Sequence, residues 1–219
     1  MNVFSMMTRG LVVGLVLLAG CGGTLPKVDP YSGLLPAGTS VVDSKTPFTA
    51  ASLKRETAHL VVGGNFVNYA DVWEKVRENA GKSGVFSRAA ELEMSDRWSP
   101  ARTTGLVTAS LQKHFKDIVV VSDLADARAK RAKWIVMFDH AYIQPAWAVP
   151  TYTNTTTIDL LDNNLQRVVG GMFSEQKQHA VSAVGGQAEG LRLTRLLGDD
   201  VLRSVNAAIL EFDAKLAAH

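Results

Sequence analysis

The stretch Trp134-Ile-Val-Met-Phe-Asp-His-Ala-Tyr-Ile143 decides the fold of this chain. Successive side chains of a strand point to opposite faces of a sheet. Both sets of alternating positions are apolar here: Trp134, Val136 and Phe138 on one face, and Ile135, Met137 and Ala141 on the other. A strand that is apolar on both sides needs cover on both sides. We therefore predict that residues 134–143 form a central strand of a sheet.

Asp139 and His140 lie side by side within this strand. A carboxylate can orient a histidine that acts as a base, but neighbours in a strand face opposite ways. We expect that these two do not cooperate, and that one is buried with a partner while the other is exposed.

Upstream, Ser99-Pro100 is typical of a helix cap followed by a first-turn proline. Val107, Leu111 and Phe115 then recur at four-residue spacing, which predicts a helix ending near Lys116. Residues 118–121 predict a buried strand, and Asp123 is a cap for a short Ala-rich helix to about residue 132.

Further upstream, Leu60-Val61-Val62 is a short apolar run that opens the folded region. A helix is expected from Tyr69 to Ala80, with Asn68 as its N-cap. Residues 85–98 fit either a helix or a strand.

Downstream, residues 152–161 and 165–173 predict a β-hairpin closed by Asp162-Asn163-Asn164. Gly170-Gly171 inside its second strand indicates a bulge or a close backbone approach.

Residues 187–216 predict a long amphipathic helix that covers the sheet. Its apolar stripe consists of Leu197, Val201, Val205, Ala208, Phe212 and Leu216. Asp199 with Arg203, and Glu211 with Lys215, are expected to pair on the wet side. The 3.5-residue repeat is too short to favour a coiled coil.

These elements define the fold class as α/β: a two-layer sandwich with a mixed, largely antiparallel sheet and helices mostly on one face. Residues 49–219 are assigned to one such domain. A hydrophobic content of 47% is sufficient for a substantial core.

Residues 21–48 contain Pro26, Pro30, Pro36 and Pro47 with glycines between them, which argues against a helix or a central strand. We interpret the segment as a tether. Tyr31, Leu34 and Leu35 could still dock locally.

Residues 1–20 have the features of a signal peptide: Arg9, an apolar core from Leu11 to Leu18, and small residues at Ala19 and Gly20. The core is too short to cross a bilayer. Leu18-Ala19-Gly20-Cys21 resembles the lipobox of bacterial lipoproteins. The resemblance implies lipid on the Cys21 thiol, removal of the preceding peptide and acylation of the new amino group, with palmitate among the acyl chains. Because Gly22 follows, it also implies an outer-membrane location facing the periplasm. An ordinary secretory signal with a chance cysteine is the alternative.

Composition and motifs exclude several classes of function. The 23 basic and 21 acidic residues are nearly balanced, so nucleic acid is not an expected partner. Cys21 is the single cysteine, the five histidines are widely spaced, and no metal, phosphate-loop or serine-nucleophile motif is present. We expect no enzyme activity, no metal and no cofactor.

The element order also resembles small periplasmic lipoprotein domains: auxiliary lipoproteins of ABC-type transport systems, activators of peptidoglycan synthases and curli-secretion-type lipoproteins. The resemblance covers residues 99–216 and rests on residues 111–115, 127–138, 158–162 and 168–173. It implies binding to envelope proteins or lipid without covalent chemistry.

The loop before the hairpin contains the expected contact surface. Trp147 and Tyr152 flank a proline, and Thr155 lies in a Thr-rich strand that could be a sheet edge accepting a partner strand. We predict a non-catalytic binding or assembly component of the cell envelope, with an unidentified envelope protein as partner and a homo-oligomer possible. The alternative is a carrier of lipid or a small ligand, in a groove between the last helix and the sheet.

Overall fold

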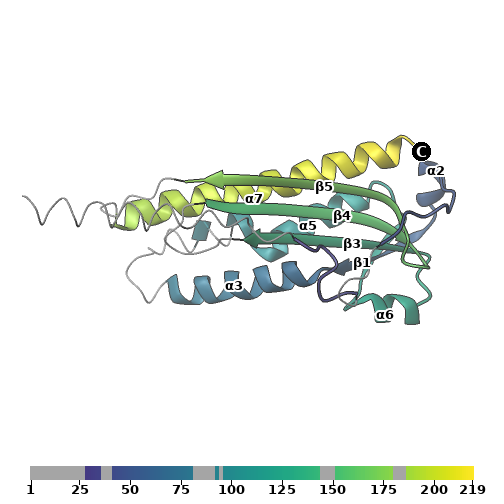
Figure 1. Ribbon diagram of the computed structural model, residues 1–219, viewed down its shortest axis with the longest axis horizontal. Helices are drawn as coiled ribbons and strands as arrows, with labels where there is room; N and C mark the ends of the chain where they lie inside the picture. The colour runs from purple at the N-terminus through teal and green to yellow at the C-terminus, as the bar shows by residue number, and fades with distance from the viewer. Residues whose placement is uncertain (1–27, 36–40, 81–91, 94–95, 144–150, 180–185) are drawn as a thin grey trace, which may run out of the picture.

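The computed structural model describes residues 28–35, 41–80, 92–93, 96–143, 151–179 and 186–219. Five strands form one sheet in the order β2-β1-β3-β4-β5 (Figure 1). Their bounds are Thr57–Val62 (β1), Asp117–Val120 (β2), Trp134–Ile143 (β3), Thr151–Asp162 (β4) and Arg167–Gln178 (β5). The helices are Ala50–Leu53 (α2), Gly64–Ala80 (α3), Pro100–Leu111 (α5), Leu124–Ala129 (α6) and Gly186–Ala217 (α7).

The prediction that residues 134–143 form a central strand is confirmed. β3 lies between β1 and β4, and its side chains enter two separate apolar cores. β1 pairs in parallel with β2 and β3, whereas β3, β4 and β5 pair antiparallel along most of their length. The sheet is therefore mixed and largely antiparallel, as expected.

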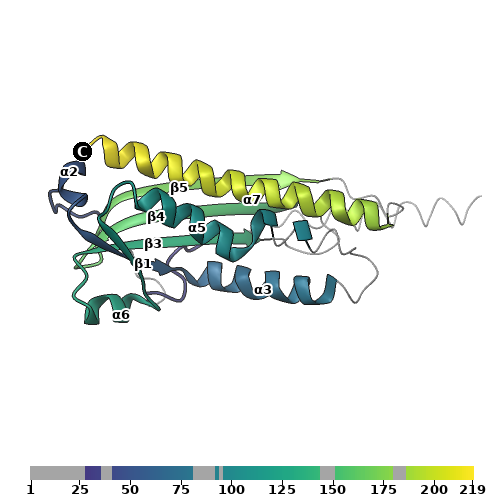
Figure 2. The same ribbon diagram turned by 180° about the vertical axis from the view of Figure 1, so that it is seen from behind.

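Helices α3, α5 and α7 pack on one face of the sheet, as the two opposite views show (Figures 1 and 2). Their core includes Phe66, Val107 and Phe212, which meet Val136 and Phe138 of β3. On the other face, the core is smaller and combines α6 with residues near the chain start, among them Tyr31, Leu34, Leu35 and Val41. The two-layer α/β fold with helices mostly on one face is confirmed.

Two boundaries differ from the predictions upstream of β3. α3 begins at Gly64, so Asn68 lies inside the helix and is not its cap. The side chain of Asp139 instead accepts a hydrogen bond from the backbone N–H of Phe66 in the first turn (2.9 Å). A carboxylate from a neighbouring strand thus satisfies an orphan donor, which local sequence patterns cannot show.

The prediction of a strand at residues 118–121 is confirmed, but the prediction that this strand is buried is wrong, because β2 lies at the edge of the sheet. Val119 and Val120 are exposed, and the apolar run of four residues reflects strand propensity more than burial. The capping predictions nearby are confirmed: Ser99 and Asp123 each accept a hydrogen bond from the first turn of the helix that follows. α5, however, ends at Leu111, not near Lys116.

The β4–β5 hairpin is confirmed, and its glycines make the close approach that was predicted. A Cβ atom added to Gly171 would lie 2.7 Å from the carbonyl oxygen of Ala208 and 2.8 Å from the nitrogen of Phe212. The backbone of α7 therefore rests directly on β5. The register of the hairpin also shifts between Leu160 and Leu161, next to the glycine pair.

α7 covers the sheet with the predicted stripe: Val201, Val205, Ala208, Phe212 and Leu216 are buried. Glu211 and Lys215 pair at 2.6 Å. The predicted pair of Asp199 and Arg203 is wrong, since Arg203 contacts Asp200 and Glu175 while Asp199 contacts Arg97. In the described part of residues 85–98, residues 92–93 and 96–98 are helical. No helix within the described ranges combines the length and hydropathy needed to cross a membrane.

Candidate functional site

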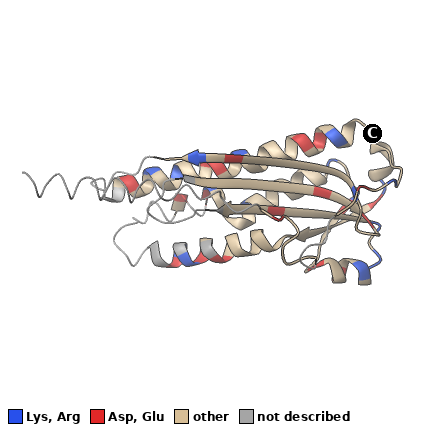
Figure 3. Cartoon of the chain, viewed as in Figure 1, with Lys and Arg blue, Asp and Glu red and all other residues tan. Residues whose placement is uncertain are grey.

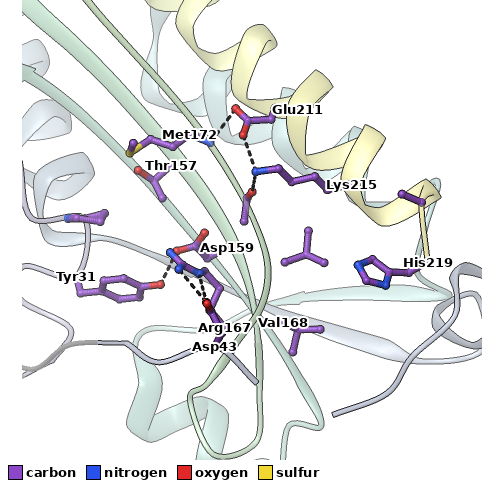
Figure 4. Close-up of a pocket in the computed structure, with 14 residues that line it drawn as sticks. Tyr31, Asp43, Thr157, Asp159, Arg167, Val168, Met172, Glu211, Lys215 and His219 are labelled. Atoms are coloured by element: carbon purple, nitrogen blue, oxygen red, sulfur yellow. Dashed lines mark hydrogen bonds and ion pairs between the residues drawn. The ribbon is translucent and has the colours of Figure 1, made fainter. Parts of the chain in front are cut away.

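A pocket of about 680 Å³ lies at the edge of the sheet, where β5 meets the end of α7 (Figure 4). Its walls come from three parts of the chain: the early segment, the β4–β5 hairpin and the chain end. The main lining residues are Tyr31, Asp43, Thr157, Asp159, Arg167, Gly170, Met172, Glu211, Lys215 and His219. The volume is within the range of small-molecule sites. We call it the β5-edge pocket.

The early segment is part of this site because it docks on the face of the sheet opposite α7. Tyr31 is 8% exposed, and its hydroxyl donates a hydrogen bond to the carboxylate of Asp159. Ser44 and Thr46 donate to Asp162 at 2.5 and 2.9 Å. The local docking of Tyr31, Leu34 and Leu35, left open by the sequence, is what the structure shows.

Asp159 is the most enclosed ionisable group of the pocket, at 3% exposed. Burial raises its pKa, and the hydrogen bond from Tyr31 and the charge of Arg167 oppose that rise only in part. Its neighbour across the hairpin is Gly170, where an added Cβ would lie 2.1 Å from Asp159 Oδ1. Glycine at this position thus allows the carboxylate to pack directly on the backbone of β5.

The two cations of the pocket are already engaged. Arg167 donates to Asp43 Oδ1 through Nε (3.0 Å) and Nη2 (2.8 Å). Lys215 donates to Glu211 at 2.6 Å and to the carbonyl oxygen of Gly170 at 2.7 Å. Figure 4 shows both pairs flanking Asp159, which itself forms no ion pair within the described residues. Three carboxylates therefore face two cations here.

Lys215 and Glu211 also block part of the β5 edge. Glu211 accepts from the backbone N–H of Met172 at 3.3 Å, and Lys215 takes up the carbonyl of Gly170. N–H and C=O groups on a free edge invite another strand, so these side chains protect this stretch of β5 from strand pairing.

A second polar cluster lies on the opposite face of the sheet, around Asp200 of α7. Its carboxylate accepts from the Tyr152 hydroxyl, from Lys177 (2.9 Å) and from Arg203, and contacts His179 Nε2 at 2.7 Å. These hydrogen bonds outweigh burial and hold the pKa of Asp200 far below its usual value. The cluster links β4, β5 and α7 through hydrogen bonds and ion pairs, which is a structural role.

Asp139 and His140 point to opposite faces, as expected, but the expectation that one is exposed is wrong. Asp139 is 1% exposed, and burial raises its pKa to about 6 although Asn65 and Phe66 donate to it. His140 is fully buried against Thr156, 2.9 Å away, and burial lowers its pKa to about 4. Figure 3 shows the carboxylates as isolated bands on otherwise uncharged strands β3 and β4.

The predicted contact surface is not assembled as expected. The Thr-rich strand is no edge, because β4 lies between β3 and β5. Tyr152 is 2% exposed and bound to Asp200, and Thr155 is buried with its hydroxyl 2.9 Å from that of Ser174. Trp147 and Cys21 lie outside the described residues. Among the described residues, no group of three or more His, Cys, Asp or Glu side chains is placed to hold a metal ion.

The residues of the β5-edge pocket were not identified from sequence. A signal was present in the hairpin, where one strand carries Asp159 between apolar residues and the other carries paired glycines. The cross-strand register that sets Asp159 opposite Gly170 links the two features. The participation of Tyr31 has no local signal, because it depends on contact across 128 residues.

No protein-family model matches this chain, and no curated protein sequence matches it. Solved structures similar to it include a PelC dodecamer from Paraburkholderia phytofirmans (14% identity, 77% of this chain and 95% of that one, TM-score 0.31). A minor lipoprotein from Acinetobacter baumannii matches with 8% identity over 73% of this chain and 92% of that one (TM-score 0.32). The lipoprotein GNA1162 from Neisseria meningitidis matches with 14% identity, 68% and 98% coverage and a TM-score of 0.26.

Proposed function

We propose that this chain is a lipid-anchored component of the bacterial cell envelope that binds a partner without catalysing a reaction. Cys21 is the anchoring residue, and the domain faces the periplasm from the outer membrane. The lipobox Leu18-Ala19-Gly20-Cys21 supports the anchor.

The observation that carries this proposal is the docking of the segment behind the anchor. Tyr31 is bonded to Asp159, and Asp43 is ion-paired with Arg167, so the chain joins the sheet soon after Cys21. Lipid on Cys21 would thereby hold the folded domain itself near the membrane, with the face that carries α6 and the early segment tied to the anchor. Such an arrangement suits a component that must meet other envelope proteins at a defined position.

The anchor is tested with Cys21→Ser in the full chain. Metabolic labelling with an alkyne-bearing palmitate should label the parent protein, and the variant should lose the label and leave the membrane fraction. A variant that keeps the label, or that remains in the outer membrane, contradicts the anchoring part of the proposal.

The partner is tested by a photoreactive residue in place of Trp147, crosslinked in intact cells. A discrete envelope-protein adduct supports the binding role and supplies the partner. Adducts to lipid alone favour a carrier, and absence of any adduct removes this loop as the contact surface.

The second candidate is the carrier, and the β5-edge pocket favours a polar ligand for it. The pocket lies beside α7, as a carrier groove would, but charged side chains line it. A lipid tail bound there would remove water from these charged groups without replacing its hydrogen bonds, which is energetically unfavourable. A small polar molecule fits the lining better.

A further inference from the structure

The β5-edge pocket contains a carboxylate whose hydrogen-bonding capacity is only partly used. An ionised carboxylate can accept about four hydrogen bonds. Asp159 accepts one through Oδ2, from Tyr31, and no described residue donates to Oδ1. Asp159 is nevertheless only 3% exposed to solvent, and it lines the cavity.

The surroundings show which kind of group would complete Asp159. Arg167 is held by Asp43, and Lys215 by Glu211 and a backbone carbonyl, so neither cation is directed at Asp159. Tyr31 supplies the donor to Oδ2, whereas Oδ1 packs over the backbone of Gly170 beside the side chain of Arg167 and has no described donor. Arg167 and Lys215 act on Asp159 only through their charge, without a direct ion pair, and a buried carboxylate in this situation favours a ligand of opposite sign.

We propose that the β5-edge pocket binds a small organic cation with a primary ammonium or guanidinium group, which donates to Asp159 Oδ1. Asp159 provides the charge recognition and Tyr31 positions the carboxylate. The carbonyl of Gly170 and the hydroxyl of Thr157 line the same cavity and can accept further hydrogen bonds. This inference rests on the proposed binding role and adds the chemistry of the ligand.

The shape of the site favours a free small molecule over a side chain of a partner protein. The cavity is about 680 Å³, and it is walled on three sides by the early segment, the hairpin and α7. That volume is within the range of small-molecule sites.

Calorimetric titration of the full chain in detergent micelles tests the proposal, with n-butylamine and agmatine as cationic probes. 1-Butanol serves as the neutral probe of matched size, and butyrate and inorganic phosphate serve as anions. We expect both amines to bind at millimolar concentration or below, and the neutral and anionic probes to bind at least about tenfold more weakly, since a charge-assisted hydrogen bond is lost.

Two variants locate the binding at Asp159. Asp159→Asn keeps an acceptor for Tyr31 but removes the charge, and Gly170→Ala places a Cβ 2.1 Å from Oδ1 and so displaces the carboxylate. Each should weaken amine binding about tenfold or more, as judged on protein with an unchanged circular dichroism spectrum. Asp199→Asn, at an exposed carboxylate of α7 outside the pocket, is the matched control and should bind amines as the parent does.

Tighter binding of butyrate or phosphate than of the amines would overturn the proposal, as would amine binding unchanged in both Asp159→Asn and Gly170→Ala. No heat of binding with either amine would also overturn it. The proposed anchored role has its own readout in palmitate labelling and membrane fractionation of the same preparations, so failure of one is distinguishable from failure of the other.

Discussion

The hydroxyl of Tyr31 donates a hydrogen bond to the buried carboxylate of Asp159, which lies 128 residues later in the chain. This contact joins the segment before the first strand to the middle of β4. It both closes one wall of the β5-edge pocket and fastens the early segment to the sheet.

We expect Tyr31→Phe to loosen the early segment without unfolding the sheet. The variant keeps the ring but leaves Asp159 without its donor, a loss of about 1–3 kcal/mol in the free energy of unfolding. Urea denaturation measures the loss, and limited proteolysis should show faster cleavage within residues 28–48. Tyr69→Phe, which loses a hydrogen bond to the Trp98 carbonyl, is the matched control. Equal rates of cleavage in the two variants would contradict the conclusion that the Tyr31 hydroxyl fastens the early segment to the sheet.

Gly171→Ala should destabilise the protein by roughly 1–3 kcal/mol, because its Cβ would overlap the backbone of α7. Gly105→Ala in α5 is the matched control, since nothing lies within 4 Å of its added Cβ. That exposed helical position should gain about 1 kcal/mol from better helix propensity. Chemical denaturation measures the free energy of unfolding of both variants. If α7 rests on Gly171, this free energy falls in Gly171→Ala and rises in Gly105→Ala.

Asp139 should make the protein less stable as the pH rises from 3.8, its ordinary pKa, to about 6, its pKa in the fold. In that interval the folded state holds a proton that the unfolded state has released, so stability falls with pH. A shift of about two units corresponds to roughly 3 kcal/mol. His140, whose pKa is lowered to about 4, acts in the opposite direction over much of this interval.

The contribution of Asp139 is isolated by comparing the pH dependence of stability in the parent and in Asp139→Asn. His140 is present in both proteins, so its effect cancels from the difference. As the pH rises from 4 to 6, the free energy of unfolding of Asp139→Asn should increase relative to that of the parent. Parallel pH profiles would show that Asp139 does not titrate with the fold.

Asp200→Ala should cost about 3 kcal/mol, because it removes the acceptor shared by Tyr152, Lys177 and Arg203. The pKa of Asp200 is depressed in the fold, so its contribution is present above the ordinary value of 3.8 and is lost as the pH falls. The gap between parent and variant should thus narrow below about pH 5. Asp199→Ala, one residue away and exposed, should change stability by less than about 0.5 kcal/mol.

Periodicity predicted the elements with strong patterns and failed where long-range contacts determine the outcome. The two-sided apolar run of residues 134–143 and the stripe of α7 each follow from one window of sequence, and both were located correctly. The start of α3 was not, since its first turn is capped by Asp139 from β3. The burial of β2 was also misjudged, because a short apolar strand looks the same at an edge as in a core.

The candidate site was less accessible from sequence than the fold. Tyr152 and Thr155 were selected for residue type, but the register of the sheet places them inside it. Asp159, Tyr31 and Gly170 have no shared motif and are brought together by strand pairing and by the docking of the early segment. Such a site is defined by tertiary structure alone.

The docking of Tyr31 also limits how far the domain can move from a membrane. Asp29 lies eight positions after Cys21, and its carbonyl oxygen accepts a hydrogen bond from Asn65 that holds the described segment containing Tyr31. Eight residues span at most about 28 Å, whatever their path. With lipid on Cys21, the domain would stay within a shallow layer next to the bilayer. Any partner that it binds must therefore extend into that layer.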